Sequence, residues 1–249
     1  MSGAQDSLQG GAHAKGWERS AEAWMAEQGA QGDWSRRHIL FPIFRGFFAR
    51  HRGKTALDIG CGEGQLVRLA KAEGIAASGL DVTPALLDRA RSLDPDGCYL
   101  EGRAEALPFA DASFDLVLSC VALIDIPDID RAIPEMARVL RPGGRMLVAN
   151  IGSQFSAGLP TGWRYDAAGR PLVFGIDRYL ERREVLSEWR GISVVNHHRP
   201  LSDYLQRFLA AGLILRGFDE PAARSDLPEK DARYNRVPYF CVMEWERPG

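Results

Sequence analysis

Alternating glycines and nearby aspartates carry the clearest chemical signal in this 249-residue chain. An apolar run leads directly into Gly60, Gly62 and Gly64, where a backbone without Cβ atoms can pass close beneath a ligand. Asp58 lies at the end of that run and favours a ligand with positive or hydroxyl-donor groups, because a phosphate cradle would need bare amides and a lysine. We therefore expect a strand here that turns directly into a helix.

A second acidic side chain, Asp81, lies near the end of the next apolar run, residues 76–82. An ionised carboxylate at a strand end can accept hydrogen bonds from both hydroxyls of a ribose. The alternative is that Asp81 caps the following helix, although Thr83 already supplies an N-cap there. The glycine spacing is G-x-G-x-G, whereas the NAD fingerprint needs a glycine where this chain has Gln65. The pattern therefore disfavours a dinucleotide.

Short apolar runs alternate with segments of helical periodicity between residues 55 and 150. We expect strands at 55–59, 76–82, 98–101, 114–121 and 145–150, and helices at 65–73, 85–92 and 130–140. Residues 141–144, Arg-Pro-Gly-Gly, read as a hard stop before the last of these strands. This alternation predicts a parallel sheet with helices on both faces, in which ligands bind beyond the carboxyl ends of the strands.

The segments around this core suggest a single elaborated domain. Residues 1–16 are rich in Gly, Ala and Gln and are expected to form a loose tail, whereas residues 17–50 are expected to form a helical, aromatic lid. The cofactor-binding core of 55–150 is followed by a predicted substrate cap, 151–197, and by a last helix and two strands within 198–249. The predicted fold of residues 17–249 is α/β: a doubly wound, mostly parallel, seven-stranded Rossmann-like sheet.

Composition excludes several classes of function. The net charge of −2 gives no basic field for nucleic acid or an anionic membrane, and no apolar run reaches bilayer length. The N-terminus lacks the pattern of a signal peptide. The four cysteines show no paired spacing, and the histidines show no metal-ligand spacing. We expect a cytoplasmic protein that binds no metal, nucleic acid or membrane, and the sequence leaves a homodimer open.

The motifs from Leu57 to Asn150 resemble, in order and spacing, those of class I S-adenosylmethionine-dependent methyltransferases. They are most similar to the small-molecule branch, which includes quinone and natural-product enzymes, and residues 198–205 (HRPLSDYL) resemble a segment common in that branch. The resemblance implies S-adenosyl-L-methionine as cofactor and methyl transfer to O or N of a small aromatic or apolar molecule. C-methylation of a quinone-type ring, or a non-catalytic S-adenosylmethionine-binding protein, are the alternatives.

The resemblance also implies a set of cofactor-binding residues. They are Asp58, Gly60, Cys61, Gly62, Asp81, Val82, Ala104, Glu105, Ser119, Cys120 and Trp34. Backbone of the glycine loop would meet the methionine and ribose, Asp58 would hold the ammonium group, and Asp81 would hold the ribose.

Adenine recognition departs from the pattern of relatives, which commonly place an aspartate where this chain has Arg103. The backbone of Ala104 is expected to bind the ring nitrogen, and Glu105 to accept the amino proton instead; the alternative is that Glu105 is a surface acid. Ser119 and Cys120 end the fourth strand and are expected near the methionine, with inert core packing as the alternative for Cys120.

Candidate general bases are His197 and His198, because an imidazole titrates in the useful range. The alternative is that one of them packs or caps a turn while the other is solvated. Asp125 stands where relatives often carry histidine, and either bonds the acceptor or caps the next helix; we favour the cap. Asn150 is a candidate for orienting a hydroxyl or amine of the acceptor.

The aromatic segments are expected to enclose the site. Trp34 is predicted to cover the cofactor, with Arg36 or Arg37 near its carboxylate; the alternative is an amphipathic helix whose arginines are solvated. The cap is also rich in aromatic residues: Trp163, Tyr165, Phe174, Tyr179 and Trp189. They either favour a flat or apolar acceptor or form a small core of their own.

Overall fold

A seven-stranded sheet forms the centre of the molecule in the computed structural model, which describes residues 3–160 and 162–249, with side chains from Gly16 onward. Its strand order is β10-β11-β5-β4-β1-β2-β3. The strands are β1 (Thr55–Ile59), β2 (Ala76–Asp81), β3 (Cys98–Glu101), β4 (Phe114–Cys120), β5 (Leu140–Ile151), β10 (Ile214–Asp219) and β11 (Phe240–Glu246). β11 alone runs against the direction of the other strands, so the predicted mostly parallel Rossmann-like sheet is confirmed.

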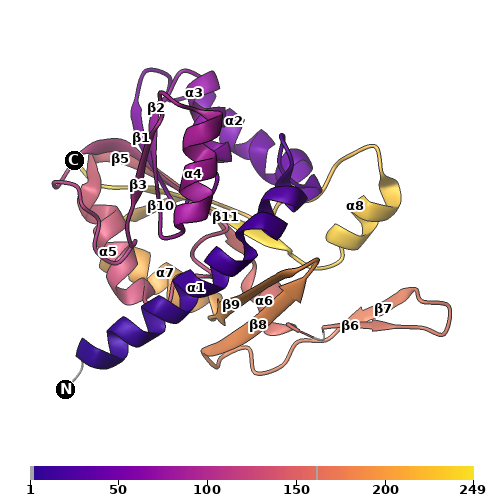
Figure 1. Cartoon of the computed structure of the whole chain (residues 1–249). Helices are drawn as coiled ribbons and strands as arrows, with labels where there is room; N and C mark the ends of the chain where they lie inside the picture. The colour runs from indigo at the N-terminus through magenta and orange to yellow at the C-terminus, as the bar shows by residue number, and fades with distance from the viewer. Residues whose placement is uncertain (1–2, 161) are drawn as a thin grey trace.

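Helices cover both faces of the sheet (Figure 1). They are α2 (Phe41–Ala49), α3 (Gln65–Ala72) and α4 (Pro84–Leu93) on one face, and α5 (Ile129–Val139) and α7 (Leu201–Ala210) on the other. Each face has its own buried apolar cluster, because the strand side chains alternate between the two faces. The sheet is therefore rigid on both sides and fixes the ends of its strands.

The strand order reverses direction between β1 and β4. The chain runs from β1 outward to β2 and β3, then returns to lay β4 and β5 on the other side of β1. The carboxyl ends of β1, β2 and β4 consequently lie together at one edge, with loops diverging to opposite faces. Such a switch point is where ligands bind in open α/β sheets.

The β5 strand is longer than the sequence suggested. It begins at Leu140, so residues 141–144 lie within it and do not form the expected hard stop. The register of β5 against β4 shifts between Phe114 and Leu116, and Gly143, with a φ of 74°, donates its N–H to the Arg247 carbonyl. The glycines thus allow an irregularity in a continuous strand, where we had predicted a break.

The N-terminal segment folds over the sheet edge. Helix α1 (Gly3–Gln28) includes most of the expected tail, so a loose segment over residues 1–16 is wrong for the part described; residues 1–2 lie outside it. The alanines and glutamines of this segment favour helix, whereas its glycines oppose it. A single π-helical turn, η1 (Arg36–Leu40), then leads into α2.

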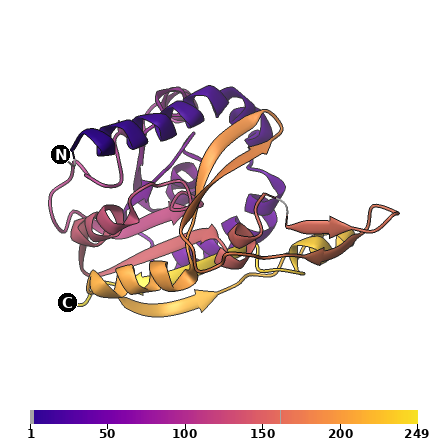
Figure 2. The ribbon, with the colours of Figure 1, turned by 90° about the horizontal axis from the view of Figure 1, so that it is seen from below.

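The segment after β5 forms α6 (Ser153–Ala157) and two hairpins. The first hairpin, β6 (Trp163–Tyr165) with β7 (Pro171–Phe174), projects away from the body (Figure 1). The second, β8 (Arg183–Trp189) with β9 (Ile192–His198), runs beside α1 (Figure 2), where Ser20 Oγ accepts from the Ser193 N–H at 3.0 Å. Helix α8 (Pro228–Tyr234) precedes β11, and no helix in the described part of the chain is long and apolar enough to span a bilayer.

Candidate functional site

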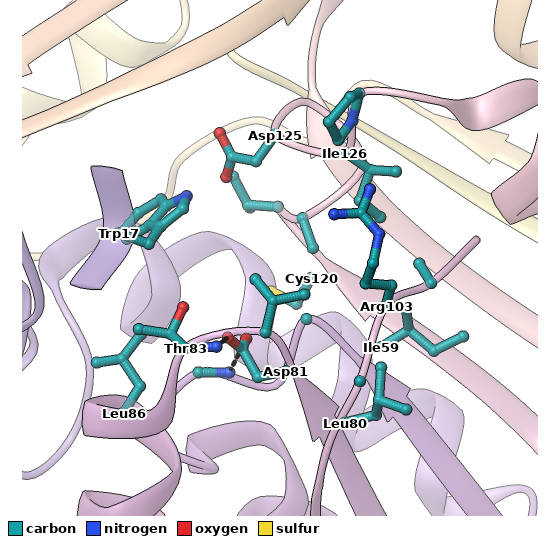
Figure 3. A pocket seen from close by; sticks show the side chains of 18 of the residues that line it. Trp17, Ile59, Leu80, Asp81, Thr83, Leu86, Arg103, Cys120, Asp125 and Ile126 are labelled. Carbon is teal, nitrogen blue, oxygen red and sulfur yellow. Dashed lines mark hydrogen bonds between the residues drawn. The ribbon is translucent and has the colours of Figure 1, made fainter. Parts of the chain in front are cut away.

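A cavity of about 710 Å³, its open mouth included, lies where β1, β2 and β4 end. Its lining comes from five regions of the chain: Trp17, Trp24 and Arg36; Ile59, Gly60 and Gly62; Leu80 to Thr83 with Leu86; Gly102 to Glu105; and Cys120 to Ala122 with Asp125 to Pro127. Figure 3 shows the labelled members of this set around the space. The cavity therefore occupies the switch point that the strand order predicts.

The glycine loop after β1 forms the floor of this cavity. Gly60 has a φ of 73°, and a Cβ there would lie 2.3 Å from Ala122 Cβ. Gly62 also has a positive φ, 53°, but a Cβ there would meet no atom closer than 3.9 Å. Gly60 is thus required by the packing of the protein itself, and Gly62 is the position at which the backbone is open to a ligand.

Asp81 joins the glycine loop to the next helix. Its Oδ2 accepts from the Gly62 N–H at 2.8 Å, and its Oδ1 accepts from the Thr83 N–H at 2.9 Å. Burial raises the pKa of this carboxyl, and these hydrogen bonds oppose the rise. Thr83 occupies the N-cap position of α4 but makes no side-chain capping bond. Asp81 therefore both lines the cavity and supports the helix start, and each of its oxygens keeps a lone pair for a ligand.

A buried carboxyl and an arginine accompany Asp81. The Asp58 side chain is 1% exposed, and its Oδ1 has no hydrogen-bond partner among the described residues, although it is not part of the cavity lining. Burial raises the pKa of Asp58 to about 8, and the charge of Asp81 adds to the rise. Arg36 does line the cavity; it donates to Asp33 Oδ2 at 2.6 Å and lies over the Trp24 ring. An unpaired buried acceptor is costly, and a cationic ligand would relieve it.

The segment expected to recognise adenine lies on the cavity wall. Both Ala104 and Glu105 line the cavity and are buried, so the alternative that Glu105 is a surface acid is wrong. Arg103, which replaces the usual aspartate, donates to Glu105 Oε1 at 2.8 Å. Val82 and Cys120 also line the cavity.

Two other expected residues are buried elsewhere. Cys61 packs against β2 so closely that a Cβ on Gly79 would lie 2.6 Å from its Sγ, and its side chain is not in the cavity lining. Ser119 is fully buried in β4 and does not reach the cavity either. The reason is the alternation of the strand, which directs Cys120 to the opposite face from Ser119.

The aromatic cover of the cavity comes from α1, and the expectation for Trp34 is wrong. Its ring packs 4.7 Å from Tyr234 and lies under the Lys230 ammonium. Trp17 and Trp24 line the cavity instead, with ring centroids 5.1 Å apart. Their spacing of seven residues places both on one helix face, which was the signal available in the sequence.

The histidines expected to act as bases are outside the cavity. His198 is 1% exposed; its Nε2 donates to the Tyr179 carbonyl at 2.9 Å, and its Nδ1 lies 2.7 Å from Ser156 Oγ. Burial lowers its pKa. His197 donates its backbone N–H to the Ile124 carbonyl at 2.6 Å. Neither side chain lines the cavity, and the His198 side chain fits the packing alternative.

Replacing His197 and His198 together with glutamine is expected to leave cofactor affinity unchanged and turnover within about threefold of wild type. The free energy of unfolding should fall by about 1–2 kcal/mol, because glutamine cannot reproduce both bonds of the His198 ring. Calorimetry, a methyl-transfer assay and urea denaturation measure the three quantities. A loss of turnover beyond tenfold with unchanged cofactor affinity would return the histidines to the mechanism.

Asp125, for which we favoured a capping role, is part of the cavity. It lines the cavity, is 8% exposed, and accepts from Asn196 Nδ2 at 2.6 Å. The cap of α5 is Asp128, which accepts from the Arg131 N–H, so the capping role expected for Asp125 is wrong. Asn150 is fully buried and accepts from the Ile124 N–H, so it holds the loop and does not face an acceptor.

Three of the five aromatic residues of the cap pack against other rings, whereas Tyr165 and Trp189 are exposed. Trp163 meets Phe174 edge-on at 5.1 Å, and Phe174 stacks on Phe155 at the same distance. Tyr179 packs against His198. None of these five residues lines the cavity and none is buried, so neither of the two expected roles is supported.

The model of a methyltransferase domain matches residues 57–148, the part of the chain that carries the glycine loop, Asp81 and Cys120. A crystal structure of an S-adenosylmethionine-dependent methyltransferase from Mesorhizobium loti superposes with a TM-score of 0.74 at 29% identity, over 83% of this chain and 96% of that one. Residues 57–148 form a methyltransferase domain, and the fold of the chain is that of S-adenosylmethionine-dependent methyltransferases. Its fold and motif order both agree with that family.

Two curated relatives of this methyltransferase are malonyl-[acyl-carrier protein] O-methyltransferases. The protein from Erwinia billingiae is 31% identical over 67% of this chain and 61% of its own length. The protein from Serratia marcescens is 30% identical over 66% of this chain and 62% of its own length. The chain thus spans less than two thirds of these relatives.

The polar groups in and beside the cavity fit S-adenosylmethionine, the cofactor named for the Mesorhizobium loti structure. An arginine suits a carboxylate, a buried unpaired carboxyl suits an ammonium, and an acid at the end of β2 suits ribose hydroxyls. Among the described residues no group of three or more His, Cys, Asp or Glu side chains is arranged to hold a metal ion, and all four cysteines are free thiols.

Proposed function

We propose that this protein transfers the methyl group of S-adenosylmethionine to an oxygen or nitrogen of a small acceptor. The observation that carries the proposal is one cavity at the switch point, in which Asp81 bridges the glycine loop and α4 while a second carboxylate, Asp125, lies at the far end. A site that only sensed the cofactor would need no second carboxylate there.

The proposed cofactor contacts follow the lining of the cavity. Asp81 and Val82 receive the ribose, and Ala104 and Glu105 receive the adenine. The backbone of residues 60–62 and the Asp58 carboxylate hold the methionine end, with Arg36 beside its carboxylate. These assignments are supported by the two free lone pairs of Asp81 and by the unpaired Asp58 Oδ1.

When bound, the cofactor supplies a methyl group already activated by its sulfonium. The chain then has to align the acceptor and exclude water, and positioning of this kind can contribute about 7–11 kcal/mol. Trp17 and Trp24 provide an apolar cover. Burial raises the pKa of Cys120 to about 12, so its thiol stays neutral and does not compete for the methyl group.

The proposed acceptor is small and apolar or aromatic. Support comes from the apolar walls beside Asp125, namely Ile126, Pro127 and Trp17. The two curated relatives are named for an acceptor on an acyl carrier protein, so an acceptor presented on a carrier belongs to the same proposal. The proposal also includes a homodimer and a cytoplasmic location. It assigns α1 the role of a lid and residues 151–197 the role of a substrate cap.

Calorimetric titration with S-adenosylmethionine tests the proposal. We expect one site per chain, with affinity that rises between about pH 6 and pH 8. The pKa of Asp58, raised to about 8 in the free protein, makes the carboxyl neutral at low pH, whereas the ammonium group of the ligand binds the ionised form. Above about pH 8 the α-amino group itself loses its proton and affinity should fall.

Asp58→Asn is the matched variant, because it removes the titrating group and keeps the shape. This variant should bind S-adenosylmethionine more weakly than wild type at about pH 8, and its affinity should no longer rise between about pH 6 and pH 8. Absence of binding at every pH, or no methyl transfer to any of a panel of phenols, alcohols and amines, would contradict the proposed enzyme. Transfer to ring carbon would favour the C-methylation alternative.

A further inference from the structure

We infer that Asp125 receives the acceptor and selects groups that bring a proton, a hydroxyl or an ammonium, over groups that bring a carboxylate. The inference rests on the proposed function and names the acceptor class for the same cavity. It sets this chain apart from relatives named for a malonyl acceptor, because a malonyl thioester carries a free carboxylate.

Asp125 occupies the end of the cavity away from the ribose residue. In Figure 3 its carboxylate faces the Trp17 side, while Asp81 lies at the opposite end of the view with Cys120 between them. Asp125 belongs to the loop that follows β4, and 8% of it is exposed. A carboxylate placed between an apolar cover and the position of the methyl donor is in reach of the group that attacks.

The orientation of this carboxylate is fixed by a short chain of hydrogen bonds. Ser187 Oγ donates to Asn196 Oδ1 at 2.5 Å, which turns the Asn196 amide so that Nδ2 donates to Asp125 Oδ1 at 2.6 Å. The Asn196 bond to Oδ1 thus comes from the β8–β9 hairpin. The second oxygen, Oδ2, therefore remains available on the cavity side for an acceptor.

The loop that carries Asp125 is held just as firmly. The Asp125 N–H donates to the Ala122 carbonyl at 2.9 Å, and Ile124 bonds both Asn150 and the backbone of His197. Arg199 donates to three further carbonyls of this loop. Fixed geometry of this kind is what a group must have if it is to receive a proton during transfer.

The charges around Asp125 favour a cationic or neutral acceptor. Burial, and after it the charge of Asp81, raise the pKa of Asp125 to about 8. The hydrogen bond from Asn196 and the charges of Arg199 and Arg36 lower the pKa. A bound sulfonium adds one positive charge to the cavity and thereby favours the ionised carboxylate. A second carboxylate brought beside it would face like charge in a site of low dielectric constant.

The proton balance of the reaction agrees with this role. The lone pair of the acceptor oxygen or nitrogen forms the bond to the methyl carbon, the carbon–sulfur bond breaks, and its electron pair stays on sulfur as a thioether. A hydroxyl acceptor gives its proton to Asp125 Oδ2 as the new bond forms. An ammonium acceptor first gives one proton to Asp125 Oδ2, and only then does its nitrogen have the lone pair that attacks. A carboxylate acceptor has no proton to lose and would gain nothing from Asp125.

The test is an acceptor-binding experiment on the full chain saturated with S-adenosylhomocysteine at about pH 8. Benzylamine and benzoate are the probes, since they share a flat apolar ring and differ in charge. We expect benzylamine to bind at least about tenfold more tightly than benzoate, a difference of about 1.4 kcal/mol. In Asp125→Asn the preference should fall to below about twofold, and Asp125→Ala gives a second variant without the amide.

Asp128→Asn is the matched control, because it removes a carboxylate three positions away that caps α5 and is not in the cavity lining. Asparagine caps a helix as well as aspartate, so this variant should keep the wild-type preference. Equal binding of the two probes, no binding of either, or an unchanged preference in both Asp125 variants would overturn the inference. If S-adenosylhomocysteine itself fails to bind, the proposed function falls with it; if it binds, only the inference is at stake.

Discussion

Replacing Asp81 with alanine is expected to weaken S-adenosylmethionine binding at least tenfold, and by as much as about a hundredfold. A hydrogen bond to a charged group contributes about 1.5–3 kcal/mol, and the Asp81 carboxylate is the proposed acceptor for the ribose hydroxyls. The substitution also frees the Gly62 N–H, which Asp81 Oδ2 now holds at 2.8 Å. Both effects act on the same ligand, which is why this change should be among the largest in the molecule.

Calorimetry measures this loss, and two variants make it specific. Asp81→Asn keeps the shape and one acceptor oxygen, so its affinity should lie between those of wild type and Asp81→Ala. Asp88→Asn removes an exposed acid from the same α4 region, where it pairs with Arg91, and should bind normally. An affinity within about threefold of wild type for Asp81→Ala would end the ribose assignment.

Replacing Arg199 with methionine is expected to lower the free energy of unfolding by about 3 kcal/mol. The guanidinium is buried and donates to the carbonyls of Leu123 at 3.1 Å, Ile126 at 2.6 Å and Pro127 at 2.8 Å. Methionine fills the space but leaves buried acceptors without donors, at about 1–3 kcal/mol each, partly offset because a buried charge is also removed. Acceptor binding should fall as well, since this loop carries Asp125.

Urea denaturation of Arg199→Met, with Arg216→Met as the matched control, measures the effect. Arg216 is an exposed arginine paired with Glu246, so its loss should change stability by no more than about 0.5 kcal/mol. Arg199→Lys should also be destabilised, because an ammonium cannot present the planar fork that reaches several carbonyls. If Arg199→Met had the same free energy of unfolding as Arg216→Met, the loop of residues 123–127 would not depend on Arg199.

The core of the fold was predictable because its signals are local. The glycine loop, the acidic strand end at Asp81 and the apolar runs of β1 to β4 are each decided by residues within one element or one turn. Glycine spacing was sufficient to place the cofactor region, although the reason for Gly60 is its contact with Ala122. That contact joins residues far apart in the chain, so it could not be read from spacing.

The errors share one physical cause: they concern which side of an element faces the cavity. Trp24 lies on the side of α1 that covers the site, whereas Trp34 lies beyond the end of that helix and packs against Tyr234. His197 contributes its backbone N–H, which bonds the Ile124 carbonyl, and the buried ring of His198 packs beside Ser156. Neither side chain faces the cavity. The importance of Asp125 depends on Asn196, which lies 71 positions further along the chain.

The pairing of Ser20 with Ser193 has a consequence for the order in which the molecule is made. The two residues are 173 positions apart, and they fasten α1 to β9 by two hydrogen bonds. During synthesis α1 emerges first, yet the strand that it needs appears only after the whole β1–β5 core. Closing a loop of this length carries an entropic cost that local contacts do not. The β1–β5 part of the sheet can therefore assemble while the cover is still open, and the cover closes only after β9 has been made.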